Sequence, residues 1–287
     1  MADTIPTHYA TEFSTNWIAR VQQSKSKLEP FVSPESFMGE RKRYDRLYKQ
    51  DSRERTSRKA PTPITDVTSD FRWVHRKTYD LANMLAEEDA QNLAPLVLPT
   101  SEYVASHAKA HQRDIDRVVI AAATGSVYTG EDGTTSTAFD SAYAIAAGGT
   151  GLTLAKLLST REIMETADLE EGAARVIVCG PKQITDLLNT TEIKSADYNT
   201  VRALAQGQID TFMGFKFVYS NLLSKASTTR TCFAMVTGAV KLVKGAMRTK
   251  ISVRDDLSNA TQIFSSWDLS AVRIYDEGVV KIDCTES

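Results

Sequence analysis

The segment between residues 41 and 77 limits what this chain can fold into more than any other part of its sequence. It carries twelve basic and five acidic side chains, a net charge of +7 within a chain whose net charge is −2. A stretch this polar cannot bury enough apolar surface to offset its ordering entropy, so it stays disordered or becomes ordered against something else. Acidic clusters elsewhere in the sequence would give this basic segment a surface to bind on another copy of the chain. The basic residues are Arg41, Lys42, Arg43, Arg46, Lys49, Arg53, Arg55, Arg58, Lys59, Arg72, Arg76 and Lys77.

The second half of this segment shows the alternation that is typical of a strand. Ring-bearing side chains occupy every other position from Phe71 to His75, with Arg72 and Val74 between them. We expect residues 37–80 to form a long two-stranded excursion with a mobile tip. Roughly seventeen residues per strand would reach about 55 Å, whereas a compact body of this length has a radius of gyration of about 19 Å. The excursion should therefore project beyond its own domain.

The bulk composition excludes several classes of protein. A chain of 287 residues with 42% apolar and 24% charged residues is ordinary for a soluble globular protein of one or two domains. No apolar run approaches the roughly 20 residues of a membrane helix, and the N-terminus lacks the pattern of a signal peptide. Three cysteines, far apart in the sequence, predict a reducing cytoplasm and no disulfide framework.

Two segments outside the basic one indicate helices. Residues 99–123 predict a long helix of about 35 Å, capped by Thr100 or Ser101. In the N-terminal arm, Trp17 lies on the apolar face of a short helix with no core of its own, so we expect this face to dock elsewhere. The predicted buried stripe of the long helix comprises Val104, Ala108, His111, Ile115, Val118 and Ala122.

The second half of the chain reads as an α/β block followed by strands. Gly148, Gly149 and Gly151 predict a flexible joint at a domain boundary. The α/β block has expected helices from residue 154 to about 167, at 181–189 and at 197–206, with strands at 175–179 and 211–219. The expected later strands are 232–236, 248–253, 262–275 and 279–283. The last two flank a short turn and should pair as a hairpin.

The sequence predicts no catalytic, cofactor or metal residue. The glycine-rich stretch at 148–151 lacks the lysine and hydroxyl residue of a P-loop, so a hinge is the better interpretation. His107 and His111 have metal-pair spacing but no obvious third ligand, and a core histidine is preferred. Nucleic-acid binding by the basic segment is a further alternative, with Phe71 and Trp73 available for stacking. The interleaved acids favour self-association instead.

Four phrases of the sequence carry a resemblance that covers about the last two-thirds of the chain and is weakest in the loop. They are RTSRKAPTPI, ADLEEGAARVIVCGPKQITDLL, IKSADYNTVRALAQGQIDTFMGFKFVYSN and ATQIFSSWDLSAVRIYDEGVVKIDC. In these phrases and in its order of parts, the sequence resembles the major capsid proteins of tailed bacteriophages with the Hong Kong 97-type fold. The resemblance implies an α+β fold with an N-terminal arm at 1–36, an extended β-hairpin loop at 37–80, a peripheral domain at 81–147 with a spine helix at 99–123, an axial α/β domain at 148–228, and a β-rich return to the peripheral domain at 229–287.

The resemblance also implies a function and its partners. The protein would assemble into the icosahedral shell around the double-stranded DNA of a tailed phage, as a non-enzyme without a cofactor. It would be found in the virion and assembled in the host bacterial cytoplasm. Its partners would be itself as pentamers and hexamers, a scaffolding protein, the portal and, as an option, a decoration protein, with DNA contacted only non-specifically and no membrane. Because the chain starts at its own methionine with no large leading segment, we expect that scaffolding protein to be a separate chain.

We expect the arm and loop to supply the inter-subunit contacts. Their predicted contact residues are Trp17, Phe37, Met38, Arg41, Arg43, Tyr44, Arg46, Leu47, Tyr48, Arg53, Arg55 and Arg58. The glycines at 148, 149 and 151 would let the axial domain tilt as the shell expands. Two alternatives stay open: an encapsulin-like cellular compartment with the same fold, and an α/β nucleotide-binding enzyme.

Overall fold

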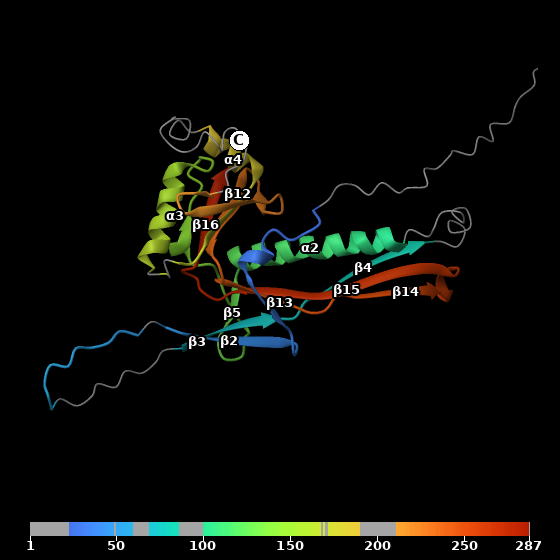
Figure 1. The fold of residues 1–287 in the computed structure, drawn as a ribbon, viewed down its shortest axis with the longest axis horizontal. Coiled ribbons are helices and arrows are strands. Elements are labelled where there is room, and N and C mark those ends of the chain that lie inside the picture. The colour runs from blue at the N-terminus through green and yellow to red at the C-terminus, as the bar shows by residue number, and fades with distance from the viewer. Residues whose placement is uncertain are drawn as a thin grey trace, which may run out of the picture.

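The computed structural model describes residues 23–48, 50–59, 69–85, 100–167, 169, 172–189 and 211–286. Within them the chain forms a long, flat peripheral part and a compact α/β part at one end of it, and a loop projects from their junction (Figure 1). The expected arm helix around Trp17 and the expected helix at 197–206 lie outside the described residues.

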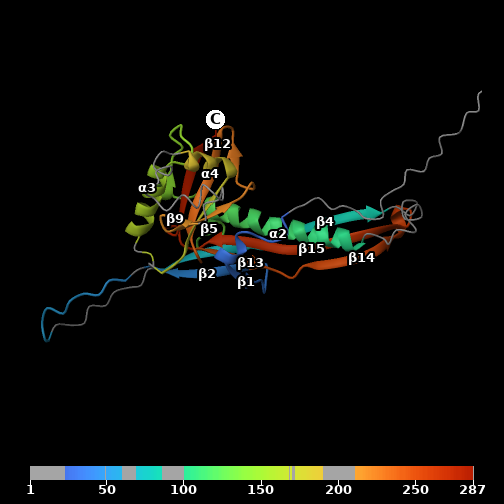
Figure 2. The same ribbon diagram turned by 45° about the horizontal axis from the view of Figure 1, so that its top comes forward.

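The long helix α2 (Thr100–Thr124) confirms the predicted spine and lies along the peripheral sheet, packed on its longest strand (Figures 1 and 2). Its buried face differs from the expected stripe. Ile115 is fully buried as expected, but Ala108 is exposed. His107 and Asp116 are buried in its place, because each finds a polar partner from a distant segment.

The peripheral sheet is built around one long strand, β15. Its strands run in the order β1, β13, β15, β14. β13 pairs with residues 269–273 of β15, whereas β14 and β4 both pair antiparallel with its first half, at 260–266 and 261–268. Their bounds are β1 Ser33–Ser36, β4 Thr78–Leu85, β13 Val240–Lys244, β14 Arg248–Arg254 and β15 Ala260–Arg273. The strands expected at 248–253 and 262–275 are confirmed as β14 and β15, whereas β1, β4 and β13 were not predicted.

The axial α/β part contains the second large sheet, in the order β7, β16, β12, β8, β10, β9, with β11 paired to β12. The strand expected at 175–179 and the helices expected from 154 and at 181–189 are confirmed as β8, α3 and α4. The bounds are β7 Ala144–Ile145, α3 Leu154–Thr166, β8 Arg175–Cys179, α4 Pro181–Leu188, β9 Thr211–Phe212, β10 Phe215–Tyr219, β11 Lys225–Ala226, β12 Thr229–Val236 and β16 Val279–Thr285.

The expected hairpin of the last two strands is wrong. β15 pairs with β13, β14 and β4, whereas β16 pairs with β12 and β7 in the axial sheet. The turn at 276–278 therefore carries the chain from one sheet to the other. The physical reason is that Asp276 is held by arginines of the loop base, described below, and this contact is invisible in the local sequence.

The three cysteines lie on neighbouring strands of the axial sheet, although they are far apart in the sequence. Cys179, Cys232 and Cys284 belong to β8, β12 and β16, and all three are free and fully buried. Burial raises the pKa of the Cys179 thiol to about 12, so it is protonated at neutral pH. The Cys179 thiol therefore packs as a small apolar side chain of the core.

Residues 23–32 form a strap that ties α2 to the axial sheet. The buried Asp116 carboxylate accepts hydrogen bonds from the Ser26 hydroxyl at 2.6 Å and from the backbone N–H groups of Lys27 and Leu28 at 3.1 Å. The Lys27 ammonium reaches the Tyr219 carbonyl at 3.0 Å and lies 4.2 Å from the centre of its ring. The strap then continues into β1, which extends the peripheral sheet.

Asp116→Asn should detach this strap. An amide presents an N–H group towards donors that need an acceptor, and hydrogen bonds to a charged group contribute about 1.5–3 kcal/mol each. We expect the free energy of unfolding of the unassembled subunit, measured in urea, to fall by about 2 kcal/mol. The exposed Asp255→Asn variant is the matched control. Equal stability of the two variants would show that Asp116 does not anchor the strap.

Candidate inter-subunit surface

The base of the projecting loop is an antiparallel ribbon, as predicted, but a shorter one. Strand β2 (Arg41–Leu47) pairs with β3 (Ser69–His75) over seven residues, not roughly seventeen. β3 continues into a sheet with β5 (Val127–Thr129) and β6 (Thr135–Thr137) of the same chain.

The turn between β5 and β6 helps to fix the ribbon. The Trp73 indole donates a hydrogen bond to the Gly130 carbonyl at 2.7 Å. Gly133 has a φ of +66°, and a Cβ there would lie 2.6 Å from the Trp73 ring. The turn around Gly133 thus holds the ribbon through a close contact with the Trp73 indole, and only glycine leaves room for that contact.

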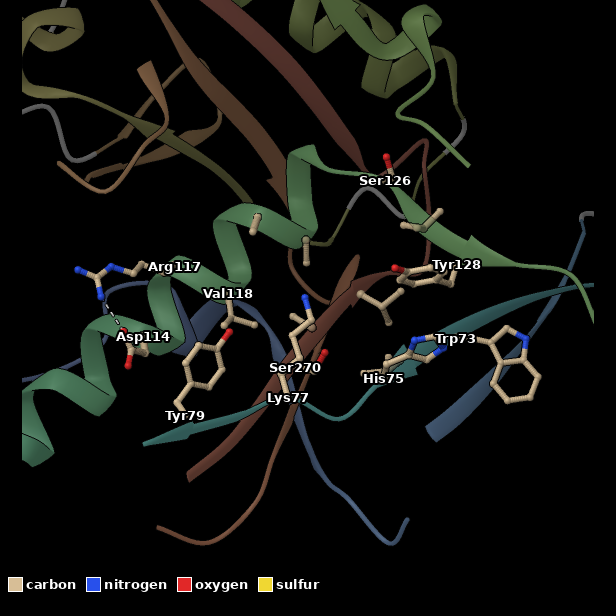
Figure 3. Close-up of a pocket in the computed structure, with 16 residues that line it drawn as sticks. Trp73, His75, Lys77, Tyr79, Asp114, Arg117, Val118, Ser126, Tyr128 and Ser270 are labelled. Carbon is tan, nitrogen blue, oxygen red and sulfur yellow. Dashed lines mark hydrogen bonds and ion pairs between the residues drawn. The ribbon is translucent and has the colours of Figure 1, made fainter. Parts of the chain in front are cut away.

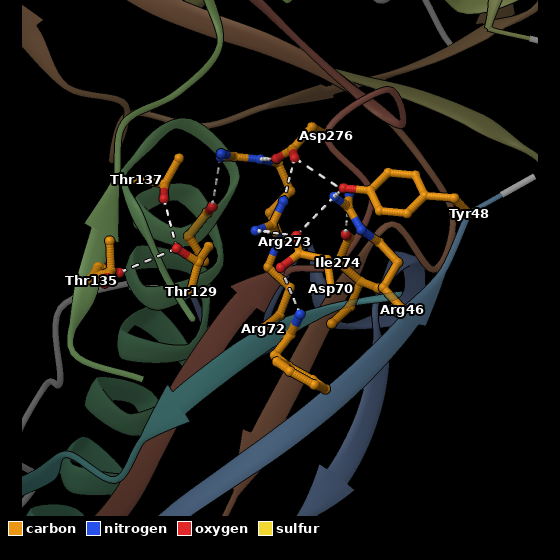
Figure 4. Close-up of polar contacts among 12 residues, drawn as sticks. Arg46, Tyr48, Asp70, Arg72, Thr129, Thr135, Thr137, Arg273, Ile274 and Asp276 are labelled. Carbon is orange, nitrogen blue, oxygen red and sulfur yellow. Dashed lines mark hydrogen bonds and ion pairs between the residues drawn. The ribbon is translucent and has the colours of Figure 1, made fainter. Parts of the chain in front are cut away.

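A buried ion cluster locks the ribbon onto the body of the molecule (Figure 4). Asp276 contacts three guanidinium groups: Arg72 at 2.5 Å, Arg273 at 2.8 Å and Arg46 at 3.4 Å. Asp70 accepts from Arg46 at 3.2 Å and from Arg72 at 3.1 Å. The three arginine side chains are 1–7% exposed, so their guanidinium groups are largely shielded from solvent screening.

Arg273 connects this cluster to the end of the spine helix. Its Nη1 donates to the carbonyls of Ala123 at 2.9 Å and Gly125 at 3.0 Å, where α2 ends. Its guanidinium also lies over the Phe139 ring, 4.5 Å from the centroid. Unsatisfied carbonyls and the negative end of the helix dipole are suited to a cation. The direction of the loop is therefore set by the spine helix through Arg273 and Asp276.

Part of the expected contact surface is internal. Arg46 is 8% exposed, and its donors go to the Ile274 carbonyl, to Tyr48 and to the two cluster aspartates. The expectation that the whole basic segment finds no surface on its own chain is wrong for the two ribbon strands, because Asp276 supplies the missing countercharge from more than two hundred positions away. Phe37 and Tyr44 also pack inward, against the cluster around Val74.

Other expected contact residues face outward. Met38 is fully exposed, Leu47 is 69% exposed and Tyr48 is 44% exposed. Arg41 and Arg43 are exposed as well, although Arg43 pairs with its neighbour Asp45 at 2.8 Å. These side chains form an outward-facing surface at the loop base.

The loop tip, residues 50–59, is the largest continuous exposed segment of the described chain. Every one of its residues is exposed, and it contains no strand. Arg55 donates to the carbonyls of Ser57 at 3.1 Å and Arg58 at 2.6 Å, a local turn that presents the basic side chains outward. Arg53 and Arg58 are likewise exposed. The prediction that the tip lacks contacts with its own body therefore agrees with the structure for these ten residues.

A groove of about 540 Å³ lies between the spine helix and the linker from β3 to β4 (Figure 3). His75 and Tyr128 stack at 4.5 Å between ring centroids on one wall. Asp114 and Arg117 pair at 2.7 Å on the helix above. Apolar side chains such as Val118 and Val272 line the groove together with these polar ones.

The glycine joint is fastened rather than free. Gly148 and Gly149 have φ values of +57° and +70°. Residues other than glycine rarely adopt this backbone conformation. The Lys156 ammonium donates to the carbonyls of residues 147, 150, 151 and 283 at 2.8–3.0 Å. Lys156 is only 8% exposed. Sequence reasoning missed it, because a lysine on a helix ordinarily indicates a solvated face.

Lys156→Met should loosen the joint without unfolding the axial sheet. The four carbonyls lose the charged donor that holds them together, and a hydrogen bond to a charged group contributes about 1.5–3 kcal/mol. We expect backbone amides at 150–156 to exchange hydrogen at least tenfold faster, with little change in β8. Lys250→Met, on an exposed strand, is the control. Unchanged exchange in the Lys156→Met variant would show that the glycine turn holds itself.

Other kinds of site are not indicated by the described residues. Within these ranges no group of three or more His, Cys, Asp or Glu side chains is placed to hold a metal ion. Of the helices in the described part, none is both long and apolar enough to cross a bilayer. His107 donates to or accepts from the Ser265 hydroxyl at 2.8 Å, and His111 meets Trp267 edge-on at 5.4 Å, so both pack on the peripheral sheet.

Comparison with known proteins identifies the family. The family model described as "Phage capsid protein" matches residues 5–286. The capsid of cyanophage P-SCSP1u has a TM-score of 0.71 at 15% identity, over 98% of this chain and 94% of that one. The capsid of the native GTA particle has a TM-score of 0.71 at 12% identity, over 99% of both chains. The capsid of Myoviridae phage XM1 has a TM-score of 0.67 at 15% identity, over the full length of both.

These structural likenesses show a shared Hong Kong 97-type fold, while the family match extends over nearly the whole sequence. No sequence among the curated proteins matches the chain. The comparisons favour neither a cellular compartment shell nor a nucleotide-binding enzyme. The chain belongs to the phage capsid protein family and is a major capsid protein of a tailed bacteriophage.

Proposed function

We propose that the loop tip at 50–59 binds a neighbouring subunit and that the copies close into pentamers and hexamers within the shell. The observation that carries this proposal is the contrast along one loop: its base is locked by the Asp276 cluster, and its tip is exposed at every residue. A locked base aims the tip in one direction before any partner arrives, which reduces the entropy lost on binding.

The exposed side chains at the loop base extend the same surface. Met38, Leu47 and Tyr48 offer apolar area, and Arg41 and Arg43 offer charge. Trp17 remains a proposed contact of the N-terminal arm. Arg46, Phe37 and Tyr44 are removed from our proposed surface, because their side chains are used within the subunit.

The axial unit is proposed to gather around the symmetry axes of the pentamers and hexamers. We propose that this unit consists of residues from about 148 to 228 together with the later strands β12 and β16. Both of these strands pair within its sheet. The joint at Gly148, Gly149 and Gly151 is the proposed pivot during expansion of the shell, and movement there requires the Lys156 contacts to adjust.

We further propose that assembly takes place in the host cytoplasm with a scaffolding protein and a portal, and that the subunit has no catalytic activity. Membership of the phage capsid protein family supports these proposals, because a shell protein has a structural role. Packaged DNA would contact the inner surface without sequence preference, and a decoration protein on the outer surface remains an option.

Expression of the protein followed by size-exclusion chromatography and electron microscopy tests the proposal. We expect closed particles or rings of five and six subunits. Because exposed ion pairs are screened by salt, we also expect the yield of particles to fall severalfold between about 0.05 M and 1 M salt. A protein that stays monomeric at every salt and protein concentration, with and without a co-expressed scaffolding protein, would refute the proposal.

A further inference from the structure

A groove lies where the end of α3 faces the loop base. Two adjoining hollows of about 620 and 360 Å³ share Ala167 and Glu277. The larger one is walled by Leu47, Tyr48 and Tyr275 together with Leu169. The smaller one adds Glu162 and Tyr143 from opposite sides. We call the combined feature the α3 groove.

The groove is suited to cationic side chains. No ion pair within the described residues involves Glu162 or Glu277, and α3 ends there with no basic residue in its last turn. Carboxylates and an uncompensated helix C-terminus both favour a cation. Tyr48 and Tyr275 are 44% and 48% exposed, and guanidinium groups stack on such rings.

Arg46 also lines the groove, but it is only 8% exposed, and its donors go to the Ile274 carbonyl, to Tyr48 and to the cluster aspartates. Because its charge is already paired within the subunit, an occupant of the groove meets chiefly the two glutamates and the two tyrosine rings.

We propose that the α3 groove receives the loop tip of a second copy of the chain. The tip reads QDSRERTSRK and carries four cations, Arg53, Arg55, Arg58 and Lys59, interleaved with the acceptors Asp51 and Glu54. The four cations match a groove that has two carboxylates without an ion pair among the described residues and two partly exposed tyrosines. The inference rests on the proposed role of the tip and names the surface that it binds.

The occupant must come from another copy. The chain leaves the groove wall at Tyr48, and both views show its tip extending away from α3 (Figures 1 and 2). Each subunit thus offers a tip on one side and a groove for a different tip. Such a head-to-tail contact generates a closed ring when the rotation between copies closes.

Reciprocal charge reversal tests the pairing. Glu162→Arg/Glu277→Arg should lower the yield of particles at least tenfold, as should Arg55→Glu/Arg58→Glu. The quadruple variant with all four changes should recover at least a third of the wild-type yield, because the charges then match again. Glu131→Arg/Asp255→Arg, which changes two exposed acids outside the groove, should assemble normally.

Normal assembly of the Glu162→Arg/Glu277→Arg variant would overturn the proposal, and so would a quadruple variant that stays unassembled although its circular dichroism is that of the wild type. These outcomes differ from failure of the proposed role of the tip. If Arg55→Glu/Arg58→Glu alone abolishes shells while the groove variant assembles, the tip binds a surface other than this groove.

Cysteine cross-linking gives a readout that is independent of particle yield. In assembled Arg55→Cys/Glu277→Cys protein, mild oxidation should join the tip of one copy to the groove of the next, giving a ladder of covalent oligomers in non-reducing gels. Each single variant should remain monomeric, because the native cysteines are buried. Absence of the ladder in oxidised particles would contradict the proposed contact.

Discussion

Arg53→Glu/Arg55→Glu/Arg58→Glu subunits are expected to fold normally and to form no shells. All three residues lie on the exposed tip, and no cluster of the core depends on them. A single exposed ion pair contributes about 0–1 kcal/mol, but reversal of three charges turns attraction into repulsion at every copy of the contact. The loss should therefore be nearly complete, although each pair is weak.

The measurement is particle yield by size-exclusion chromatography and negative-stain microscopy, with circular dichroism to verify folding. Arg53→Lys/Arg55→Lys/Arg58→Lys is the matched control. It keeps the charge but loses the planar guanidinium, so we expect particles in reduced yield. Particles of normal number and size from the glutamate variant would refute the role of the tip.

Asp276→Asn is expected to produce the largest loss of stability of any single change at the loop base. Within the described part of the chain, Asp276 is the one side chain that Arg46, Arg72 and Arg273 share, and these arginines are 1–7% exposed. Loss of the carboxylate leaves buried guanidinium groups without their countercharge, and breaking a buried pair in this way costs about 3–5 kcal/mol. Because Asp276 itself is 22% exposed, water relieves part of this cost, and we expect about 3 kcal/mol.

Urea unfolding of unassembled subunits measures this loss, and the ribbon amides at 41–47 and 69–75 should also exchange hydrogen faster. Asp45→Asn, on the same strand ribbon but 57% exposed, is the control and should cost less than about 0.5 kcal/mol. A loss below about 1 kcal/mol for Asp276→Asn would show that the ribbon is held by its apolar contacts instead.

The same carboxylate predicts how stability depends on pH. Burial raises the pKa of Asp276, but the hydrogen bond from Arg273 and the charges of Arg72 and Arg46 outweigh burial and hold this pKa below its ordinary value. The stabilisation is therefore present above about pH 4, the ordinary aspartate value, and is lost as the pH falls through the lower folded-state pKa. Wild-type stability should decline more steeply below pH 4 than that of Asp276→Asn, and parallel curves would contradict this assignment.

The local elements were predictable where neighbouring residues decide them. The spine helix, β8, α3 and α4 follow from apolar periodicity, and their predicted bounds agree with the structure within one or two residues. The ribbon of β2 and β3 follows in the same way from the alternation around Trp73.

The misses occur where a residue is governed by a partner far along the chain. Asp116 was overlooked because a polar position on a helix ordinarily faces water, yet here it binds the backbone of 27–28. Arg46 was assigned to the outer surface because Asp276 is not its neighbour in sequence. The expected pairing of β15 with β16 as a hairpin is wrong for the same reason, because the turn residue Asp276 is bound by arginines of the loop base. Charge periodicity shows which side chains are polar but not which of them are paired.

The basic loop divides into two parts with different sources of order. Its base is ordered by the subunit itself, through the cluster of Arg46, Arg72, Arg273, Asp70 and Asp276. Its tip has every residue exposed and is proposed to gain its contacts from another copy. The rigid base and the exposed tip together provide an arm that can hold a neighbour without enlarging the core.

Limited trypsin digestion of free subunits and of assembled shells, followed by mass spectrometry, tests this division most directly, because the tip contains four trypsin sites at Arg53, Arg55, Arg58 and Lys59. We expect rapid cleavage at these sites in free subunits and at least tenfold slower cleavage in shells, while Arg46 and Arg72 are protected in both. Equally rapid cleavage of the tip in intact shells would contradict the claim that a neighbouring subunit orders it.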